Sequence, residues 1–192
     1  MIIYYTIPMT LNEVLYVLLI FIELTFLIAA SVYMILLSYS WLKGAPYVAT
    51  IKKSLKEIIN NAKITDGNHI IELGSGDGRF LRTVAKQYQI TGLGVDVNPL
   101  PIFKARIIAR LQNLTTVEFK IQDIRDTDLS EADVIYMYLI PKFIQKIKNQ
   151  LLHKTKKGAI IVSHGFKIDY LEQYLVNTIT DETFKTYFYK RS

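Results

Sequence analysis

One segment restricts the possible folds of this chain more than any other: an apolar run from Val14 to Leu37. Sixteen of its 24 residues are Leu, Ile, Val or Phe, and Glu23 is its one charged residue. A helix of about 20 apolar residues is long enough to cross the hydrocarbon core of a bilayer. The favourable free energy of inserting these side chains into the bilayer exceeds the free-energy cost of inserting one carboxyl group near the centre. We therefore predict a transmembrane helix over about residues 14–37.

The charged residues are divided sharply between two parts of the chain. Residues 1–42 contain no Lys or Arg, whereas residues 43–192 contain all 23 basic residues and 15 of the 17 acidic ones, a net charge of +8. Because basic residues collect on the cytoplasmic side of a span, the pattern predicts a single-pass membrane protein with its C-terminal part in the cytoplasm. The expected domains are a membrane anchor over residues 1–42 and a second domain over residues 43–192.

Two other readings of the apolar segment are less favoured. A signal peptide would begin with basic residues and carry a shorter apolar region. A buried core helix of this length, apolar on all faces, is hard to cover with the 150 residues that follow. Two roles stay open for Glu23: contact with a partner helix, or tolerance as an isolated charge.

Strand and helix patterns alternate in the second part of the chain. The expected strands cover residues 69–73, 92–97, 117–121, 134–139 and 159–163, with two more near 174–179 and 184–189. The expected helices cover residues 50–62, 79–88, 99 or 101 to 111, and 141–152. This alternation predicts an α/β fold, with a parallel sheet covered on both faces and a C-terminal antiparallel hairpin.

The stretch ELGSGDGR (residues 72–79) follows an apolar strand and opens a helix. In that context, Gly74 and Gly76 allow the backbone to turn tightly and to approach a ligand closely. A dinucleotide fingerprint has the spacing G-x-G-x-x-G, but Arg79 stands here in place of the third glycine. The loop is therefore predicted to bind a ligand other than a dinucleotide.

Two carboxylates follow the next two strands in order. Asp96 lies 18 residues after Gly78, where a carboxylate can accept both hydroxyl groups of a ribose. Asp123 follows the third strand, beside the expected place of an adenine amino group. The glycine loop and the two acids together predict a site for a nucleoside cofactor. The chain has no Cys and three scattered His, which excludes disulfides and argues against a metal site.

These motifs, with APYVAT (residues 45–50), DLSEADVIYMYL (128–139) and IVSHGF (161–166), resemble a class I S-adenosylmethionine-dependent methyltransferase. More narrowly, the chain resembles the small archaeal protein-lysine methyltransferases and the membrane-anchored mitochondrial lysine methyltransferases that act on the ADP/ATP carrier and on the c-subunit of ATP synthase. The resemblance covers nearly all of residues 44–192. It implies a Rossmann-like class I methyltransferase sheet, with S-adenosyl-L-methionine as cofactor.

Carried over position by position, the resemblance implies a cofactor site formed by Tyr47, Thr50, Glu72, Gly74, Ser75, Gly76, Asp77, Gly78, Asp96, Asn98, Asp123 and Ile124. The chain departs from the family pattern at Ala49, in the segment before the first helix, where a second proline is usual. It also lacks the Asn/Asp-Pro-Pro-Tyr motif of glutamine and adenine N-methyltransferases, which argues against a base or amide acceptor.

The candidate catalytic residues are Tyr47, Tyr138 and His164. A lysine acceptor must be neutral to react, and aromatic side chains that exclude water favour the neutral amine. Tyr136 and Phe166 are further aromatic candidates, although ordinary sheet packing explains Tyr136 better. His164 could orient a substrate or relay a proton, with a structural role as the alternative.

We therefore predict a membrane-tethered methyltransferase that methylates lysine side chains of a protein substrate, including membrane proteins. An alternative is methylation of a lipid, a quinone or another small molecule, and a third reading is a non-catalytic membrane adaptor. The positive charge of residues 43–192 would suit anionic lipid, an acidic protein or nucleic acid. Nucleic acid is the least favoured partner, because the KTKK run (residues 154–157) is better explained as a solvated loop.

Overall fold

The computed structural model describes residues 10–42, 52–181 and 183–192. The chain divides into two compact units, Met1–Tyr39 and Ser40–Ser192, each of which is described here by itself. The predicted site residues Tyr47 and Thr50, and the departure at Ala49, lie outside the described residues. Their roles stay predictions.

The first unit is dominated by a single helix, α1 (Leu11–Leu42). Its start is fixed by a capping box, in which the Thr10 backbone N–H donates to Glu13 Oε2 at 2.7 Å and the Glu13 N–H donates to Thr10 Oγ1 at 3.4 Å. Residues Leu11–Ile35 have a mean hydropathy of 2.4 and are long and apolar enough to cross a membrane. Within this stretch, the Thr25 hydroxyl donates a hydrogen bond to the Phe21 carbonyl at 2.7 Å.

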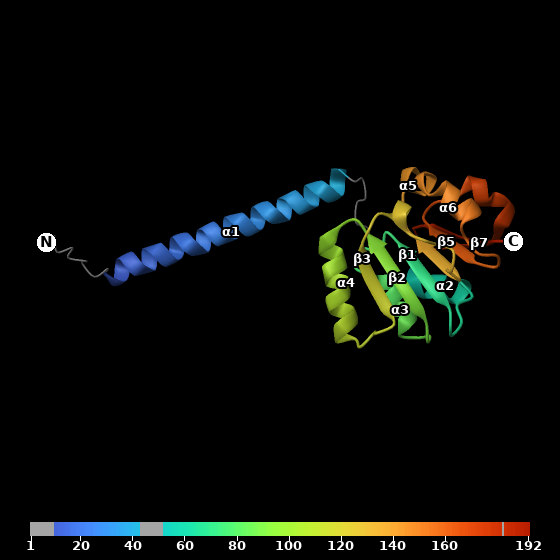
Figure 1. Cartoon of the computed structure of the whole chain (residues 1–192), viewed down its shortest axis with the longest axis horizontal. Helices are drawn as coiled ribbons and strands as arrows, with labels where there is room; N and C mark the ends of the chain where they lie inside the picture. Colours follow the sequence, from blue (N-terminus) through green and yellow to red (C-terminus); the bar gives the residue numbers. More distant parts are fainter. Residues whose placement is uncertain (1–9, 43–51, 182) are drawn as a thin grey trace. The chain divides into compact units, whose positions relative to one another are not determined.

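The second unit is built on a 7-stranded sheet in the order β3-β2-β1-β4-β5-β7-β6 (Figure 1). Its strands are β1 (His69–Leu73), β2 (Thr91–Asp96), β3 (Val117–Ile121), β4 (Val134–Met137), β5 (Ile160–His164), β6 (Leu175–Thr180) and β7 (Lys185–Lys190). Strands β1 to β5 pair in parallel, and β7 pairs antiparallel with both β5 and β6. This arrangement confirms the predicted α/β fold with its terminal antiparallel hairpin.

Helices cover both faces of the sheet. The elements are α2 (Lys52–Asn61), α3 (Arg79–Ala85), α4 (Pro99–Leu111), α5 (Pro141–Lys146), α6 (Lys148–His153) and the 3₁₀ segments η1 (Ile124–Asp126) and η2 (Asp169–Tyr174). One apolar core joins the sheet to α2, α3 and α4, and the other joins it to α5, α6, η1 and η2. Alternate residues of each strand enter opposite cores, as the two-residue period of a strand requires.

Three parts of the fold differ from the expected elements. The helix expected over residues 141–152 is interrupted at Ile147, which is fully buried and has the non-helical dihedrals φ −106° and ψ 13°. The helix expected to reach residue 88 ends at Ala85. The segment before the hairpin forms η2, which the sequence patterns did not indicate.

Candidate active site

The candidate site lies where the parallel strands end. The glycine loop follows β1, Asp96 ends β2, Asp123 follows β3, and His164 ends β5. Parallel strands bring their carboxyl ends to one edge of the sheet, so these residues share that edge. Strand order reverses between β1 and β4, the position at which open α/β sheets bind their ligands.

Backbone hydrogen bonds hold the glycine loop against the end of β2. The N–H groups of Gly74 and Ser75 both donate to the Val95 carbonyl at 2.9 Å. The Gly76 N–H donates to Asp96 Oδ2 at 2.9 Å, and the Asn98 N–H donates to Asp96 Oδ1 at 2.8 Å. The carboxylate predicted to bind a ribose therefore also fixes the loop beside it.

Positive φ angles explain why the loop needs glycine. Gly74, Gly76 and Gly78 have φ angles of 71°, 51° and 68°, in the left-handed region that disfavours side chains. Close packing adds a second reason at two of them. A Cβ on Gly74 would lie 2.7 Å from Leu139 Cδ2, and a Cβ on Gly78 would overlap the ring of Phe119.

The acidic residues of the ELGSGDGR stretch, Glu72 and Asp77, are buried, and each contacts a neighbouring residue of the chain. Glu72 accepts a hydrogen bond from the Leu81 N–H at 3.1 Å, which ties β1 to α3. Burial, which outweighs this hydrogen bond, raises the pKa of Glu72 to about 8. Asp77 lies 3.2 Å from Lys104 Nζ and 3.6 Å from an Arg79 guanidinium nitrogen. Burial also raises the pKa of Asp96, against hydrogen bonds from the Asn98 and Gly76 N–H groups that lower it.

The two remaining cofactor candidates differ in their surroundings. Asn98 caps α4, because its side chain accepts a hydrogen bond from the Leu100 N–H at 3.1 Å. Asp123 forms a bidentate ion pair with Arg125, whose Nε lies 3.0 Å from Oδ1 and whose Nη2 lies 2.7 Å from Oδ2. Asn98 thus starts a helix, whereas Asp123 borders a cavity at this edge of the sheet.

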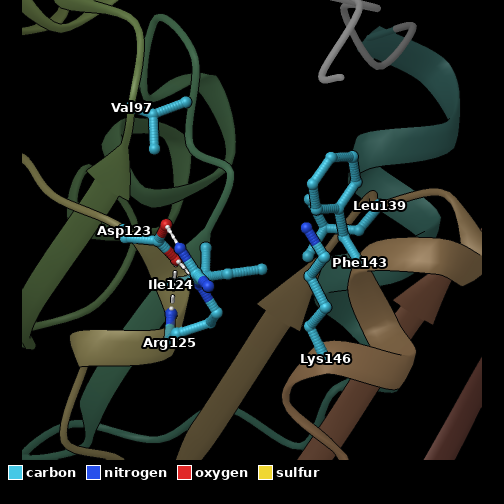
Figure 2. Close-up of a pocket in the computed structure, with 7 residues that line it drawn as sticks. All are labelled: Val97, Asp123, Ile124, Arg125, Leu139, Phe143 and Lys146. Atoms are coloured by element: carbon cyan, nitrogen blue, oxygen red, sulfur yellow. Dashed lines mark hydrogen bonds and ion pairs between the residues drawn. The ribbon is translucent and has the colours of Figure 1, made fainter. Parts of the chain in front are cut away.

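That cavity has a volume of about 60 Å³ and lies between the ends of three strands and α5. Figure 2 shows Asp123 and Arg125 on one wall, with Leu139, Phe143 and Lys146 opposite. Val97 and Ile124 complete an apolar lining that suits a flat heterocycle, with polar groups at its margin. Of the lining residues, only Asp123 and Ile124 were predicted from the sequence. Arg125, Val97, Leu139, Phe143 and Lys146 were missed, although Val97 and Leu139 directly follow predicted strands.

These residues fit a nucleoside cofactor. The cavity would hold the base, and the Asp96 carboxylate at its side has the acceptor chemistry that ribose hydroxyl groups need. In addition, Ser75 Oγ is buried and makes no hydrogen bond within the described part of the chain. A buried hydroxyl of this kind is costly unless something satisfies it, so its place in the glycine loop points to a polar ligand.

A second group of side chains lies just after β4, at the end of β5 and in the hairpin. The Tyr138 ring contacts those of His164 and Phe184 edge-on, at centroid distances of 4.6 and 5.7 Å. His164 is buried, and its Nδ1 lies 2.8 Å from the Thr186 hydroxyl. Burial lowers the pKa of His164, which favours the neutral imidazole. The structure thus brings two catalytic candidates together and adds Phe184, which the sequence did not indicate.

Two other aromatic candidates lie elsewhere. Tyr136 is buried and stacks on Phe80 with a centroid distance of 3.9 Å, so packing accounts for it. Phe166 packs with the core on the opposite side of the sheet from Tyr138. Phe166 and Tyr138 therefore pack on opposite faces of the sheet, and the structure does not bring Phe166 into the group around Tyr138.

Burial of Glu72 predicts that stability falls as the pH rises. The unfolded chain releases this proton near the ordinary value of 4.5, whereas the folded chain keeps it to about 8. The folded state binds the extra proton in that window, so stability is lost between those two values. Glu72→Gln, which is always neutral, should match the natural chain near pH 5 and exceed its stability near pH 8 by roughly 2–4 kcal/mol.

The measurement is urea unfolding of the detergent-solubilised full chain at several pH values in this range, with circular dichroism as the signal. His164 acts with the opposite sign, because its lowered pKa makes stability rise with pH. Both proteins contain His164, so the difference between them reports Glu72 alone. Parallel pH curves for the two proteins would contradict the prediction.

The strand order, the glycine loop and the acids at successive strand ends define a Rossmann-like fold that binds a nucleoside cofactor. The chain belongs to the family described by the ANTKMT methyltransferase domain, whose model matches residues 72–174. The predicted membership in the S-adenosylmethionine-dependent methyltransferases is thereby confirmed.

Individual relatives agree with this membership. A protein-lysine N-methyltransferase of Saccharolobus islandicus (strain REY15A) is 30% identical over 131 residues, which are 67% of this chain and 81% of that protein. A human lysine N-methyltransferase, named for the c-subunit of ATP synthase, is 21% identical over 122 residues, 63% of this chain. This chain covers 52% of that human protein, about half its length.

A solved structure is similar to the second unit. The RNA methyltransferase of Salinibacter ruber, solved in complex with S-adenosyl-L-homocysteine, has a TM-score of 0.70 and 29% sequence identity. The similarity covers 74% of this chain and 93% of that one. It supports the methyltransferase fold predicted from the sequence.

Proposed function

We propose that this chain transfers a methyl group from S-adenosyl-L-methionine to the side-chain amine of lysine in a protein substrate. The observation that carries the proposal is the 30% identity to a protein-lysine N-methyltransferase, across 81% of that protein's length. The more distant human relative also bears the name of a lysine N-methyltransferase, with the c-subunit of ATP synthase as its named substrate.

The residues of the first site would hold the cofactor, which supplies an electrophilic methyl group on a sulfonium. Asp96 would accept hydrogen bonds from the ribose, and the cavity beside Ile124 and Leu139 would enclose the base. The loop from Gly74 to Gly78 would lie against the methionine part, with Ser75 Oγ available as a polar contact. Direct displacement needs alignment above all, and a loop already fixed by hydrogen bonds supplies it.

Tyr138, His164 and Phe184 would prepare the acceptor. Their rings form an aromatic group, with His164 buried and the other two half-buried, on the face of the sheet that also carries Glu72. An amine moved among such rings loses water, which lowers its pKa and favours the neutral, nucleophilic form. In the tautomer in which His164 Nδ1 donates to the Thr186 hydroxyl, Nε2 is the ring nitrogen that can accept a proton.

We further propose that α1 spans the membrane and that the methyltransferase unit lies on its cytoplasmic side. The length and hydropathy of Leu11–Ile35 support the span, and the absence of Lys and Arg from residues 1–42 supports the orientation. A span would confine the enzyme to the bilayer of its substrates and raise their effective concentration.

The proposal is tested with the full chain reconstituted in vesicles, methyl-labelled S-adenosylmethionine and membranes of the source cells. After reaction, protein, organic extract and RNA are separated and the label in each is counted. We expect label in protein, released as methylated lysine on hydrolysis and absent with Asp96→Asn. Label in the organic phase would replace lysine with a lipid or quinone acceptor, and label in RNA would replace it with the acceptor class named for the Salinibacter protein.

The aromatic group gives a sharper test of the acceptor site. Tyr138→Ala should lower kcat about 10- to 100-fold, because removal of the ring admits water and loosens alignment. The Kd for S-adenosylhomocysteine, measured by calorimetry, should change less than about threefold, since Tyr138 lies outside the cofactor cavity. Tyr138→Phe keeps the ring and is the matched control, with most of the activity retained. Equal losses in both variants would assign the role to the hydroxyl instead.

A further inference from the structure

Helix α4 carries a row of large apolar side chains on its exposed side. Phe103, Ile107 and Leu111 are 53%, 60% and 78% exposed. They are spaced four residues apart, so they lie along one face of the helix. We call these three residues the α4 outer face.

This row is distinct from the packing of α4 on the sheet. Ile102, Ala105 and Ala109 are buried in the first core and form the opposite, inner face. Single exposed apolar residues are common on protein surfaces, but a contiguous row of three large ones indicates a contact surface. The helix therefore has one apolar face in the core and a second apolar face that is exposed.

The charges on the same helix are all positive. Lys104, Arg106 and Arg110 are exposed beside the row, and residues 99–111 contain no Asp or Glu. Arg106 is braced, because its Nε donates to the Phe119 carbonyl at 2.7 Å and its guanidinium lies 5.8 Å from the Phe103 ring centroid. Apolar side chains flanked by Lys and Arg are the pattern of helices that lie in the interface of an anionic membrane.

The length of the connection between α1 and α2 limits how far the second unit can lie from such a surface. Nine residues separate Leu42, at the end of α1, from Lys52, at the start of α2. A connection of that length spans at most about 35 Å even when fully extended. If α1 crosses a bilayer, as proposed above, the second unit stays within reach of its headgroups.

We propose that the α4 outer face docks into the headgroup region of an anionic membrane, as a second contact in addition to the anchor. Phe103, Ile107 and Leu111 enter the boundary between headgroups and acyl chains, and Arg110 pairs with lipid phosphates or carboxylates. Because α4 starts directly after Asp96 and Asn98, docking holds the cofactor edge of the sheet beside the bilayer. This inference rests on the proposed anchor, and the experiment separates the two.

The chain has no native Cys, so a single engineered Cys gives a clean probe. Ile107→Cys and Val176→Cys are each spin-labelled in the full chain and reconstituted in phosphatidylcholine vesicles with and without phosphatidylserine. Val176 is the matched control, because it is 53% exposed and lies on β6, at the far edge of the sheet from β3 and α4. Access of a water-soluble nickel quencher and of oxygen is measured at both positions.

With phosphatidylserine, we expect the label at 107 to be about fivefold less accessible to nickel than the label at 176, and more accessible to oxygen. Adding Arg110→Glu should cancel most of that difference. Equal access at both positions, in protein that floats with the vesicles, would overturn the docking proposal while leaving the anchor intact. Protein that does not float would overturn the anchor and the docking together. Protection at 107 that needs an added protein or RNA, and not phosphatidylserine, would assign the face to that partner and overturn the lipid proposal.

Discussion

Replacing Asp96 with asparagine is expected to weaken the binding of S-adenosylhomocysteine by about 30- to 1000-fold. Each hydrogen bond to a charged group is worth about 1.5–3 kcal/mol, and the loss of most of two such bonds gives this range. Asparagine also has one acceptor oxygen where the carboxylate has two. It can therefore keep only one of the hydrogen bonds from Gly76 and Asn98.

Calorimetry on the detergent-solubilised full chain, at a temperature where the variant is folded, measures this effect. Asp66→Asn is the matched control, because Asp66 also accepts a backbone hydrogen bond, from the Gln89 N–H at 2.8 Å, but lies in an exposed loop before β1, at the opposite end of that strand from the glycine loop. The control should bind the ligand like the natural chain. Natural affinity in Asp96→Asn would remove Asp96 from the cofactor site.

The second large effect is expected on stability, from Gly78→Ala. Gly78 has a φ of 68°, and a Cβ there would overlap Phe119, a ring that is 2% exposed in the core. A left-handed conformation costs a residue with a side chain about 1–2 kcal/mol, and an overpacked core costs about 1–3 kcal/mol more. We expect a total loss of about 2–5 kcal/mol in the free energy of unfolding, measured by denaturant titration.

Gly158→Ala separates the two causes. Gly158 has a φ of 83°, but a Cβ there would meet no atom within 4 Å. The control should lose only the conformational cost of about 1–2 kcal/mol. Adding Phe119→Leu to Gly78→Ala should recover part of the packing cost, as a double-mutant cycle would reveal. Equal losses in the two alanine variants would contradict a role for Phe119.

The parts of this molecule that were predictable from sequence are those in which neighbouring residues decide the structure. Strands β1 and β3 begin and end at the predicted residues, because polar residues or glycine border the apolar run of β1 and the alternating pattern of β3. The glycine loop was predictable for the same reason. Its turn needs glycine locally, and the alternation of strands and helices puts the end of β2 beside it.

The parts that were missed depend on contacts between distant segments. Phe143 and Lys146 line the cavity because α5 returns to the ends of β2 and β3, which no local pattern encodes. The interruption at Ile147 lies in a helical period that continues across it. Asn98 has a local role that the sequence analysis did not predict, because its side-chain oxygen accepts a hydrogen bond from the Leu100 N–H and caps α4; its assignment to the cofactor site stays a prediction.

The hydrogen bonds from Gly74, Ser75 and Gly76 to the end of β2 have a consequence for control of the enzyme. A loop and carboxylate fixed in advance would contact the methionine and nucleoside parts, which the methyl donor and its spent form have in common apart from the methyl group, so both would compete for the site on similar terms. Product inhibition should therefore be strong. In a cell, the rate would follow the ratio of donor to spent product rather than the supply of donor alone.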